Sequence, residues 1–392
     1  MQETFELNLK TKLYFGKGKE NEVGNILKEY HANKVLIVTG QGSVVKSGLL
    51  DKVIKALNAS NIEFIQLSGV RPNPTIDLVR KGLEIVKKEG IDFLLAVGGG
   101  SVMDTTKLIA TGFYYDGDPF DISRHLYIPK KAMPFGVINT ISASGSEMSN
   151  SCVIQDDELG IKAGYGNDLN RPLFAICNPE YTFSVSPYQT SVGTVDIMMH
   201  TLERYFSNSS ASYEPSDDFA IALLKNVKKA GLEALKNPCD YDARATLMLL
   251  SSVSHNGITS IGKKYSMPVH QIEHALSATY PSVAHGAGLA VLFPAWLKYY
   301  LPYETSKIAR LGKEVFNTNY ATDLENAKMC IVEIEKYFKA LGMPLTFKDL
   351  GIKNPDIDLM AKRFSNNGTR LVDHKDKPLD QNVAVEIYKL AM

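Results

Sequence analysis

The first half of the chain alternates short apolar runs with longer segments in which apolar residues recur every three or four positions. Short apolar runs bounded by turn residues are typical of strands buried on both faces of a parallel sheet, and the longer periodicity predicts helices. The helix predicted over 75–89, for example, has one apolar face, made by Ile76, Val79, Leu83 and Val86. The predicted strands are 34–39, 63–67, 93–97, 134–140 and 173–177. This order indicates an open, Rossmann-like parallel sheet.

After residue 187 the pattern changes, because strand-like runs become rare and helical periodicities follow one another. The predicted helices are 192–205, 217–235, 243–254, 270–278, 289–300, 304–311, 323–341 and 383–390. We therefore expect an α/β plus all-α protein with a boundary near 184–187. A dinucleotide-binding α/β domain should occupy 1–185, and a helical domain should occupy 186–392.

A glycine turn follows the apolar strand at 93–97. Residues 98–100 are all glycine, and a helix is predicted to start near Ser101, a residue that is favourable as an N-cap. Glycines let a backbone come close to a ligand, and a helix N-terminus attracts phosphate. A tight turn that binds nothing would have the same sequence, and GGGS is not the usual dinucleotide fingerprint. The loops after the other strands, at 40–43, 71–74 and 141–146, should line the same crevice.

Potential metal ligands gather in the helical half of the chain. Asp196 and His200 are four residues apart, His270 and His274 are four apart, and His285 follows. Residues four apart lie on one face of a helix. A mixed set of carboxylate and imidazole groups suits a divalent first-row metal, although isolated core or surface histidines can share this spacing. Spacing alone does not decide between His270 and His274. We predict a metal centre here and expect the chemistry between the two domains.

The bulk composition restricts the partners of this 392-residue chain. The 43 basic and 43 acidic residues cancel, so no basic excess favours nucleic acid or a membrane surface. No apolar run reaches membrane-spanning length, and the N-terminus does not resemble a signal peptide. The four cysteines are widely spaced without a CxxC motif, which argues against a disulfide framework. We expect a cytoplasmic protein that acts on a small molecule.

Several motifs along the chain resemble those of one known family. They are RPNPT at 71–75, GGGSVMDTTK at 98–107, SASGSEMS at 142–149, VDIMMHTLERY at 195–205 and HQIEHALSATYPSVAHGAG at 270–288. Together they resemble the iron-containing, group III alcohol dehydrogenases, and within them the butanol dehydrogenase-like branch, over essentially the whole chain. The resemblance implies the dehydroquinate synthase-like fold, with a dinucleotide-binding domain followed by a helical metal domain. One departure is Ser144, which stands where the family commonly has threonine.

The resemblance also implies roles for particular residues. The metal ligands would be Asp196, His200, His270 and His285, holding Fe(II), with Zn(II) or Ni(II) as alternatives. His274 would face the substrate and the nicotinamide, where it could relay a proton. The residues implied in cofactor binding surround the glycine turn: Gly99, Gly100, Ser101, Asp104, Thr140, Ser149, Lys162 and Thr182. Asn73 and Pro74, in the loop at 71–74, are expected to line the same crevice.

The turn after the first predicted strand bears on the choice of dinucleotide. In such folds an acidic residue there binds the ribose 2′-hydroxyl and repels a 2′-phosphate. Gly40 stands at the position where NAD-preferring members of the family often carry aspartate, and Ser43 could donate a hydrogen bond to a 2′-phosphate. Gln41 and Val45 replace the glycine and lysine expected of a strong NADP binder. The sequence therefore favours NADP(H) over NAD(H) and leaves the use of both open.

These features predict an NAD(P)-dependent alcohol dehydrogenase or aldehyde reductase. It would transfer hydride between the cofactor and a small primary alcohol or aldehyde of the butanol type, with the metal polarising the oxygen. One alternative is a glycerol dehydrogenase-type polyol enzyme that uses NAD and zinc. Others are a metal-dependent hydrolase, which would not need the glycine turn, and a catalytically dead regulatory or metal-binding scaffold, against which the intact ligand set argues. We expect a homodimer.

Overall fold

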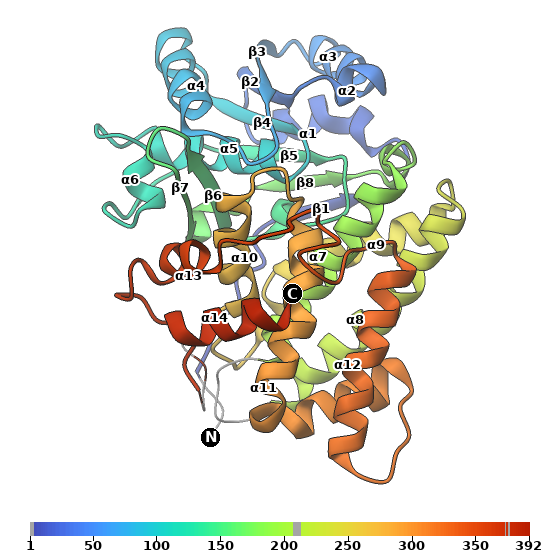
Figure 1. Cartoon of the computed structure of the whole chain (residues 1–392). Helices are drawn as coiled ribbons and strands as arrows, with labels where there is room; N and C mark the ends of the chain where they lie inside the picture. The colour runs from blue at the N-terminus through green and yellow to red at the C-terminus, as the bar shows by residue number, and fades with distance from the viewer. Residues whose placement is uncertain (1–3, 207–212, 373, 375–376) are drawn as a thin grey trace. The chain divides into compact units, whose positions relative to one another are not determined.

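The computed structural model describes residues 4–206, 213–372, 374 and 377–392. The chain forms two compact units (Figure 1). The first, here called the sheet unit, contains Asn8–Val185 and Ser251–Asn256. The second, the helical unit, contains residues 4–7 and the described parts of Ser186–Leu250 and Gly257–Met392.

The sheet unit is built on six parallel strands. They are β1 (Lys12–Phe15), β2 (Lys34–Gly40), β3 (Glu63–Val70), β4 (Phe93–Gly98), β5 (Phe135–Asn139) and β8 (Phe174–Cys177). Their order across the sheet is β1-β8-β5-β4-β2-β3. β2 and β4 are neighbours, but the chain leaves β2 toward β3 and leaves β4 toward β5 on the opposite side. The carboxyl ends of β2 and β4 therefore form a topological switch point, where open parallel sheets bind their ligands.

Both faces of this sheet are buried, which explains why its strands are wholly apolar. On β2, Leu36 and Val38 belong to one hydrophobic core, whereas Val35 and Ile37 belong to another on the opposite face. The helices of the first core are α4 (Ile76–Glu89), α5 (Gly100–Gly112) and α6 (Phe120–Ser123). Those of the second are α1 (Val23–Glu29), α2 (Ser43–Lys46) and α3 (Leu49–Ala59). The predicted parallel-sheet domain is confirmed, and all five predicted strands are present.

Three strands were not predicted. β1 has only four residues, none of them fully buried, so it carries no apolar run. The other two, β6 (Ser151–Asp156) and β7 (Ile161–Gly166), form a separate antiparallel hairpin in which polar residues and glycines interrupt the apolar ones. The prediction that Ser101 caps α5 was wrong. The helix begins one residue earlier, with Gly99 at the N-cap, so Ser101 lies inside the first turn.

The helical unit holds the remaining long elements. They are α7 (Pro187–Tyr205), α8 (Glu214–Lys236), most of α9 (Tyr241–His255), α10 (Pro268–Thr279), α11 (His285–Phe316), α12 (Asp323–Ala340), α13 (Ile357–Ser365) and α14 (Gln381–Leu390). The helices predicted at 289–300 and 304–311 are one element, α11, which bends at Glu304 two residues after Pro302. Short 3-10 helices lie at η1 (Lys19–Glu22), η2 (Ser146–Met148), η3 (Asp168–Asn170), η4 (Pro179–Thr182) and η5 (Ile258–Ser260). The predicted all-helical character of this half is confirmed.

Helix α7 lies at the centre of the helical unit and packs against α8 and α11. From Thr190 to Tyr205 every residue of α7 is buried. A helix buried on all sides is normally apolar, because burying a charged side chain without a partner is costly. The buried Asp196, His200 and Glu203 therefore need partners inside the unit.

Two general properties of the chain follow from the described residues. Within those ranges, no helix combines the length and the apolar character that crossing a membrane requires. All four cysteines are free thiols, three of them buried and Cys239 exposed.

Candidate functional site

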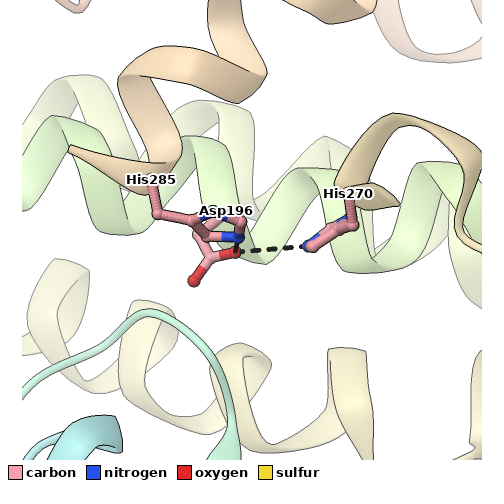
Figure 2. Close-up of side chains that lie close together, drawn as sticks. All are labelled: Asp196, His270 and His285. Atoms are coloured by element: carbon pink, nitrogen blue, oxygen red, sulfur yellow. Dashed lines mark ion pairs between the residues drawn. The ribbon is translucent and has the colours of Figure 1, made fainter. Parts of the chain in front are cut away.

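Three helices bring the predicted metal ligands together. Asp196 and His200 share one face of α7, His270 lies in the first turn of α10, and His285 is the first residue of α11. Figure 2 shows Asp196, His270 and His285 pointing toward one another from three separate segments. Their ligand atoms all lie within 4.8 Å of one another.

The distances around Asp196 Oδ1 suit a small cation. This oxygen lies 3.4 Å from His200 Nδ1, 3.7 Å from His270 Nε2 and 3.8 Å from His285 Nε2. Two ligands bound tetrahedrally at about 2.1 Å from one ion lie about 3.4 Å apart. His200 thus contributes an imidazole beside Asp196, although it lies outside the set of three with mutually close ligand atoms.

Two buried atoms of the cluster are left unsatisfied. Among the described residues, neither Asp196 Oδ1 nor His270 Nε2 has a hydrogen-bond partner. Buried polar atoms almost always have one, since leaving such a group unpaired costs about 1–3 kcal/mol. A divalent ion bound between them would satisfy both atoms. The donor set present here therefore fits a divalent metal.

The surroundings of Asp196 favour its ionised form. Burial alone would raise the pKa of Asp196, but the neighbouring imidazoles of His200, His270 and His285 overcome that effect and hold it well below its usual range. Burial would likewise lower the pKa of His270, but Glu203 and Asp196 raise it to about 9. The charged form of each group is thus stabilised by its neighbours against the cost of burial, and Asp196 is available as an anionic ligand.

Two glutamates that the sequence analysis did not identify contact these histidines. Glu203 of α7 accepts a hydrogen bond from Nδ1 of His270, and Glu273 of α10 accepts one from Nδ1 of His285. Both glutamates are almost completely buried. Helical spacing could have suggested them, because Glu203 lies two turns beyond Asp196 and Glu273 lies three residues beyond His270.

His274 lies one turn beyond His270 on α10 and is half-buried. Its ring centre is 5.6 Å from that of His285. With Glu273 and His285 it forms a second set of close ligand atoms. Glu273 already accepts the Nδ1 proton of His285, whereas Nε2 of His285 faces Asp196. We therefore favour the set around Asp196 as the metal centre, with His274 beside it.

In the sheet unit, the glycine turn lies at the switch point of the sheet. The backbone amide of Thr140 donates to Gly98 O over 3.2 Å, which joins the ends of β4 and β5. A Cβ added to Gly99 would come within 2.7 Å of Ile141 Cγ2, and one added to Gly100 within 2.7 Å of Ser144 Oγ. A side chain at either position would therefore crowd the loop that packs over the turn, independently of any ligand.

A fully buried lysine holds that loop in place. Lys107 Nζ donates to Ser146 Oγ over 2.7 Å, to Ser149 Oγ over 3.2 Å and to Ser151 O over 2.8 Å. Asp104 accepts from Ser146 Oγ over 2.8 Å and from the amide of Val153 over 3.1 Å. Asp104 and Ser149, expected to contact the cofactor, thus have internal partners that shape the turn. Lys107 was not among the residues predicted from the sequence, although it lies in the same GGGSVMDTTK motif.

The other residues expected at the cofactor lie on neighbouring loops and strand ends. Lys162 Nζ of β7 donates to Asn73 Oδ1 over 3.2 Å, next to Pro74. Thr182 in η4 is buried and donates to Pro179 O over 2.7 Å. Gly40 ends β2 and Ser43 begins α2, where its side chain is exposed. Within the sheet unit, the structure therefore joins Lys162 to Asn73, and it places Gly40 and the glycine turn at the ends of adjacent strands.

The sequence matches two family models that together span almost the whole chain. "Iron-containing alcohol dehydrogenase" matches residues 10–179, and the family's C-terminal model matches residues 190–392. The chain is 40% identical to NADH-dependent butanol dehydrogenase A of Clostridium acetobutylicum over 388 residues, which is 98% of this chain and 99% of that protein. It is 31% identical to the NADPH-dependent aldehyde reductase YqhD of Escherichia coli over 395 residues, 99% of each chain.

Solved structures agree with the sequence comparison. The crystal structure of NADH-dependent butanol dehydrogenase A from Thermotoga maritima has a TM-score of 0.94 and 34% identity, covering 100% of this chain and 99% of that one. The fold, the cluster of imidazoles and carboxylate, and the sequence comparisons lead to the same conclusion. The chain belongs to the iron-containing alcohol dehydrogenase family, whose members are oxidoreductases that use a nicotinamide cofactor.

Proposed function

We propose that this protein interconverts small primary alcohols and aldehydes of the butanol type, with a divalent metal and a nicotinamide cofactor. The observation that carries the proposal is the convergence of Asp196, His270 and His285 with unsatisfied buried atoms at its centre. Similarity to butanol dehydrogenases over nearly the whole chain supports this substrate class over a polyol. Family membership argues against a hydrolase, since the relatives' names specify nicotinamide cofactors.

The residues divide among three roles. Asp196, His200, His270 and His285 would hold the metal, with Fe(II) favoured and Zn(II) or Ni(II) as alternatives. When bound, the ion supplies a Lewis acid that polarises the substrate oxygen. His274, beside the ligands and half-buried, would move the hydroxyl proton of the substrate. The N-terminus of α5 at Gly99, Gly100 and Ser101 would hold the cofactor pyrophosphate, and hydride transfer itself is the chemistry of the nicotinamide.

The proposal is tested by metal analysis of the purified protein and by a coupled substrate scan. We expect about one divalent metal per chain and oxidation of NADH or NADPH with butanal, lost after chelation and restored by Fe(II). Glycerol with NAD⁺ is the control for the polyol alternative. A metal-loaded protein that oxidises glycerol but does not reduce butanal would exclude the proposed substrate class.

A prediction about the glycine turn separates its role in the fold from its role in binding. Gly100→Ala should lower the melting temperature, because its Cβ would crowd Ser144 Oγ. It should also lower the affinity for NAD(P)H, because the new methyl group would lie where the proposed pyrophosphate site needs bare backbone. Adding Ser144→Ala removes that oxygen and leaves Ser144 Cβ 3.6 Å from the new methyl group, an ordinary contact. The double variant should regain thermal stability but not cofactor affinity, measured by calorimetry. Recovery of both would show that Gly100 serves the fold alone.

We also propose that the enzyme prefers NADP(H) over NAD(H). No acidic side chain follows β2 at 40–43, and Lys46 is exposed on the short helix α2. The names of the related proteins include both NADH-dependent and NADPH-dependent enzymes, so the turn has to be tested directly.

Gly40→Asp is a suitable probe, because a Cβ at Gly40 meets Val70 O at 3.5 Å and Val102 Cγ2 at 3.8 Å, which is ordinary contact. We expect the ratio of kcat/KM for NADPH to that for NADH to fall about tenfold or more, since like charges placed together cost several kcal/mol. A wild type that strongly prefers NADH would contradict the preference. An unchanged ratio in the variant would show that this turn does not face the ribose.

The cellular context belongs to the same proposal. We propose a cytoplasmic enzyme, in agreement with its four free cysteines. We also propose a homodimer, which sedimentation equilibrium would measure.

A further inference from the structure

We infer that Glu203 and Glu273 are positioning residues that aim His270 and His285 at the metal and join the three ligand-bearing helices. This inference rests on the proposed metal centre. Neither glutamate is among the predicted ligands, and both are buried next to one. The arrangement occurs twice in one site, which makes a chance contact a poor explanation.

Glu203 contacts α10 through three groups. Its carboxylate accepts from Nδ1 of His270, from the backbone amide of Val269 over 2.5 Å and from that of His270 over 3.2 Å. The N-cap residue of α10 is Met267, in the left-handed region at φ 53°, and within the described structure its side chain makes no capping bond. Glu203, a residue of α7, therefore supplies the cap of α10. A carboxylate is favourable there because of the partial positive charge of the helix N-terminus.

Glu273 positions the ligand of the next helix in the same way. It lies on α10 three residues after His270, and it accepts from Nδ1 of His285, the residue that begins α11. Its side chain is closely packed, since a Cβ added to Gly288 of α11 would come within 2.9 Å of Glu273 Oε1. The imidazole of His285 is thus held through Nδ1, the nitrogen that does not face Asp196.

These contacts determine which nitrogen of each ring can bind a cation. A carboxylate that accepts the Nδ1 proton leaves the lone pair on Nε2, and it makes that nitrogen more basic. In both histidines, Nε2 is the atom that faces Asp196 Oδ1. The structure therefore forms a chain in which α7 positions the ligand of α10 through Glu203, and α10 positions the ligand of α11 through Glu273.

The test measures Co(II) binding to the full chain, by chelator competition and by the visible absorption spectrum of bound Co(II). Glu203→Ala and Glu273→Ala should each weaken Co(II) binding about 10- to 100-fold and change the spectrum. Glu203→Gln and Glu273→Gln should recover most of both, because the amide oxygen can still accept the Nδ1 proton. If an Ala variant does not fold, the Gln variants still test the inference. We expect them to bind Co(II) somewhat more weakly than wild type and to keep the shape of the wild-type spectrum.

Asp217→Asn is the matched control for a merely structural effect. Asp217 is a buried carboxylate of the same unit that pairs with Lys263. We expect this variant to lose stability while keeping the affinity and the spectrum of wild-type Co(II) protein. The inference is overturned if the glutamate variants bind Co(II) as wild type does while His270→Ala does not. Wild-type protein that binds no Co(II) would instead refute the metal centre itself.

Discussion

His270→Ala should lose the metal, whereas His274→Ala, one helical turn away, should keep it. His270 presents Nε2 3.7 Å from Asp196 Oδ1 and would be a direct ligand. Removing a residue that only supports a ligand typically costs 10- to 100-fold in metal affinity, so loss of the ligand itself should exceed about 100-fold. Turnover should be abolished with it. In His274→Ala, kcat should fall about 10²- to 10⁴-fold at full metal occupancy if His274 moves the proton.

The measurement pairs elemental analysis after dialysis with steady-state kinetics for both variants. The two residues lie on the same helix, so loss of helix packing alone would affect them similarly. Equal metal loss in both variants, or retention in both, would show that the two histidines have been assigned to the wrong roles.

Lys107→Met should destabilise the protein by about 3–5 kcal/mol, the usual cost of removing one partner from a buried ion pair. Lys107 is completely buried and lies 3.8 Å from Asp104, and it donates to Ser146, Ser149 and the backbone of Ser151. Burial lowers the pKa of this lysine, with Asp104 opposing the shift. Methionine fills a similar volume but satisfies none of these oxygens.

Urea unfolding of the full chain measures the change in the free energy of unfolding. The affinity for NAD(P)H is measured on the same variants. Lys87→Met on the exposed end of α4 is the control and should change the free energy of unfolding by less than about 0.5 kcal/mol. We also expect weaker cofactor binding in Lys107→Met, since Ser146 and Ser149 lie in the loop over the glycine turn. A Lys107→Met protein as stable as wild type would mean that this network contributes no net stabilisation.

The regions of the fold that could be predicted are those governed by local patterns. The central strands could be identified because both faces of the sheet are buried, so Leu36 and Ile37 are both apolar. The hairpin of β6 and β7 could not, because its stability comes from packing beside α5 rather than from an apolar run of its own. The start of α5 was misplaced by one residue, since the backbone of the glycine turn, and not the serine side chain, determines where the helix begins.

In the proposed metal centre, too, only the features that depend on neighbouring residues could be predicted from the sequence. Helical spacing identified Asp196 with His200 and His270 with His274 as pairs. It could not decide which histidine of α10 faces Asp196, because that depends on how α10 is rotated against α7. Glu203 sets that rotation through contacts across 66 and 67 positions of the chain, which no sequence periodicity reveals.

The unequal exposure of the ligands has a consequence for the kinetics of metal exchange. The side chain of His285 is 29% exposed, whereas those of Asp196 and His270 are 7% exposed. An ion held among them would be more accessible beside His285 than beside Asp196 or His270. We therefore expect a chelator to approach from that side, with His285 as the first ligand to be displaced. Substitutions that loosen the start of α11 should accelerate metal release more than substitutions of similar size in the middle of α7.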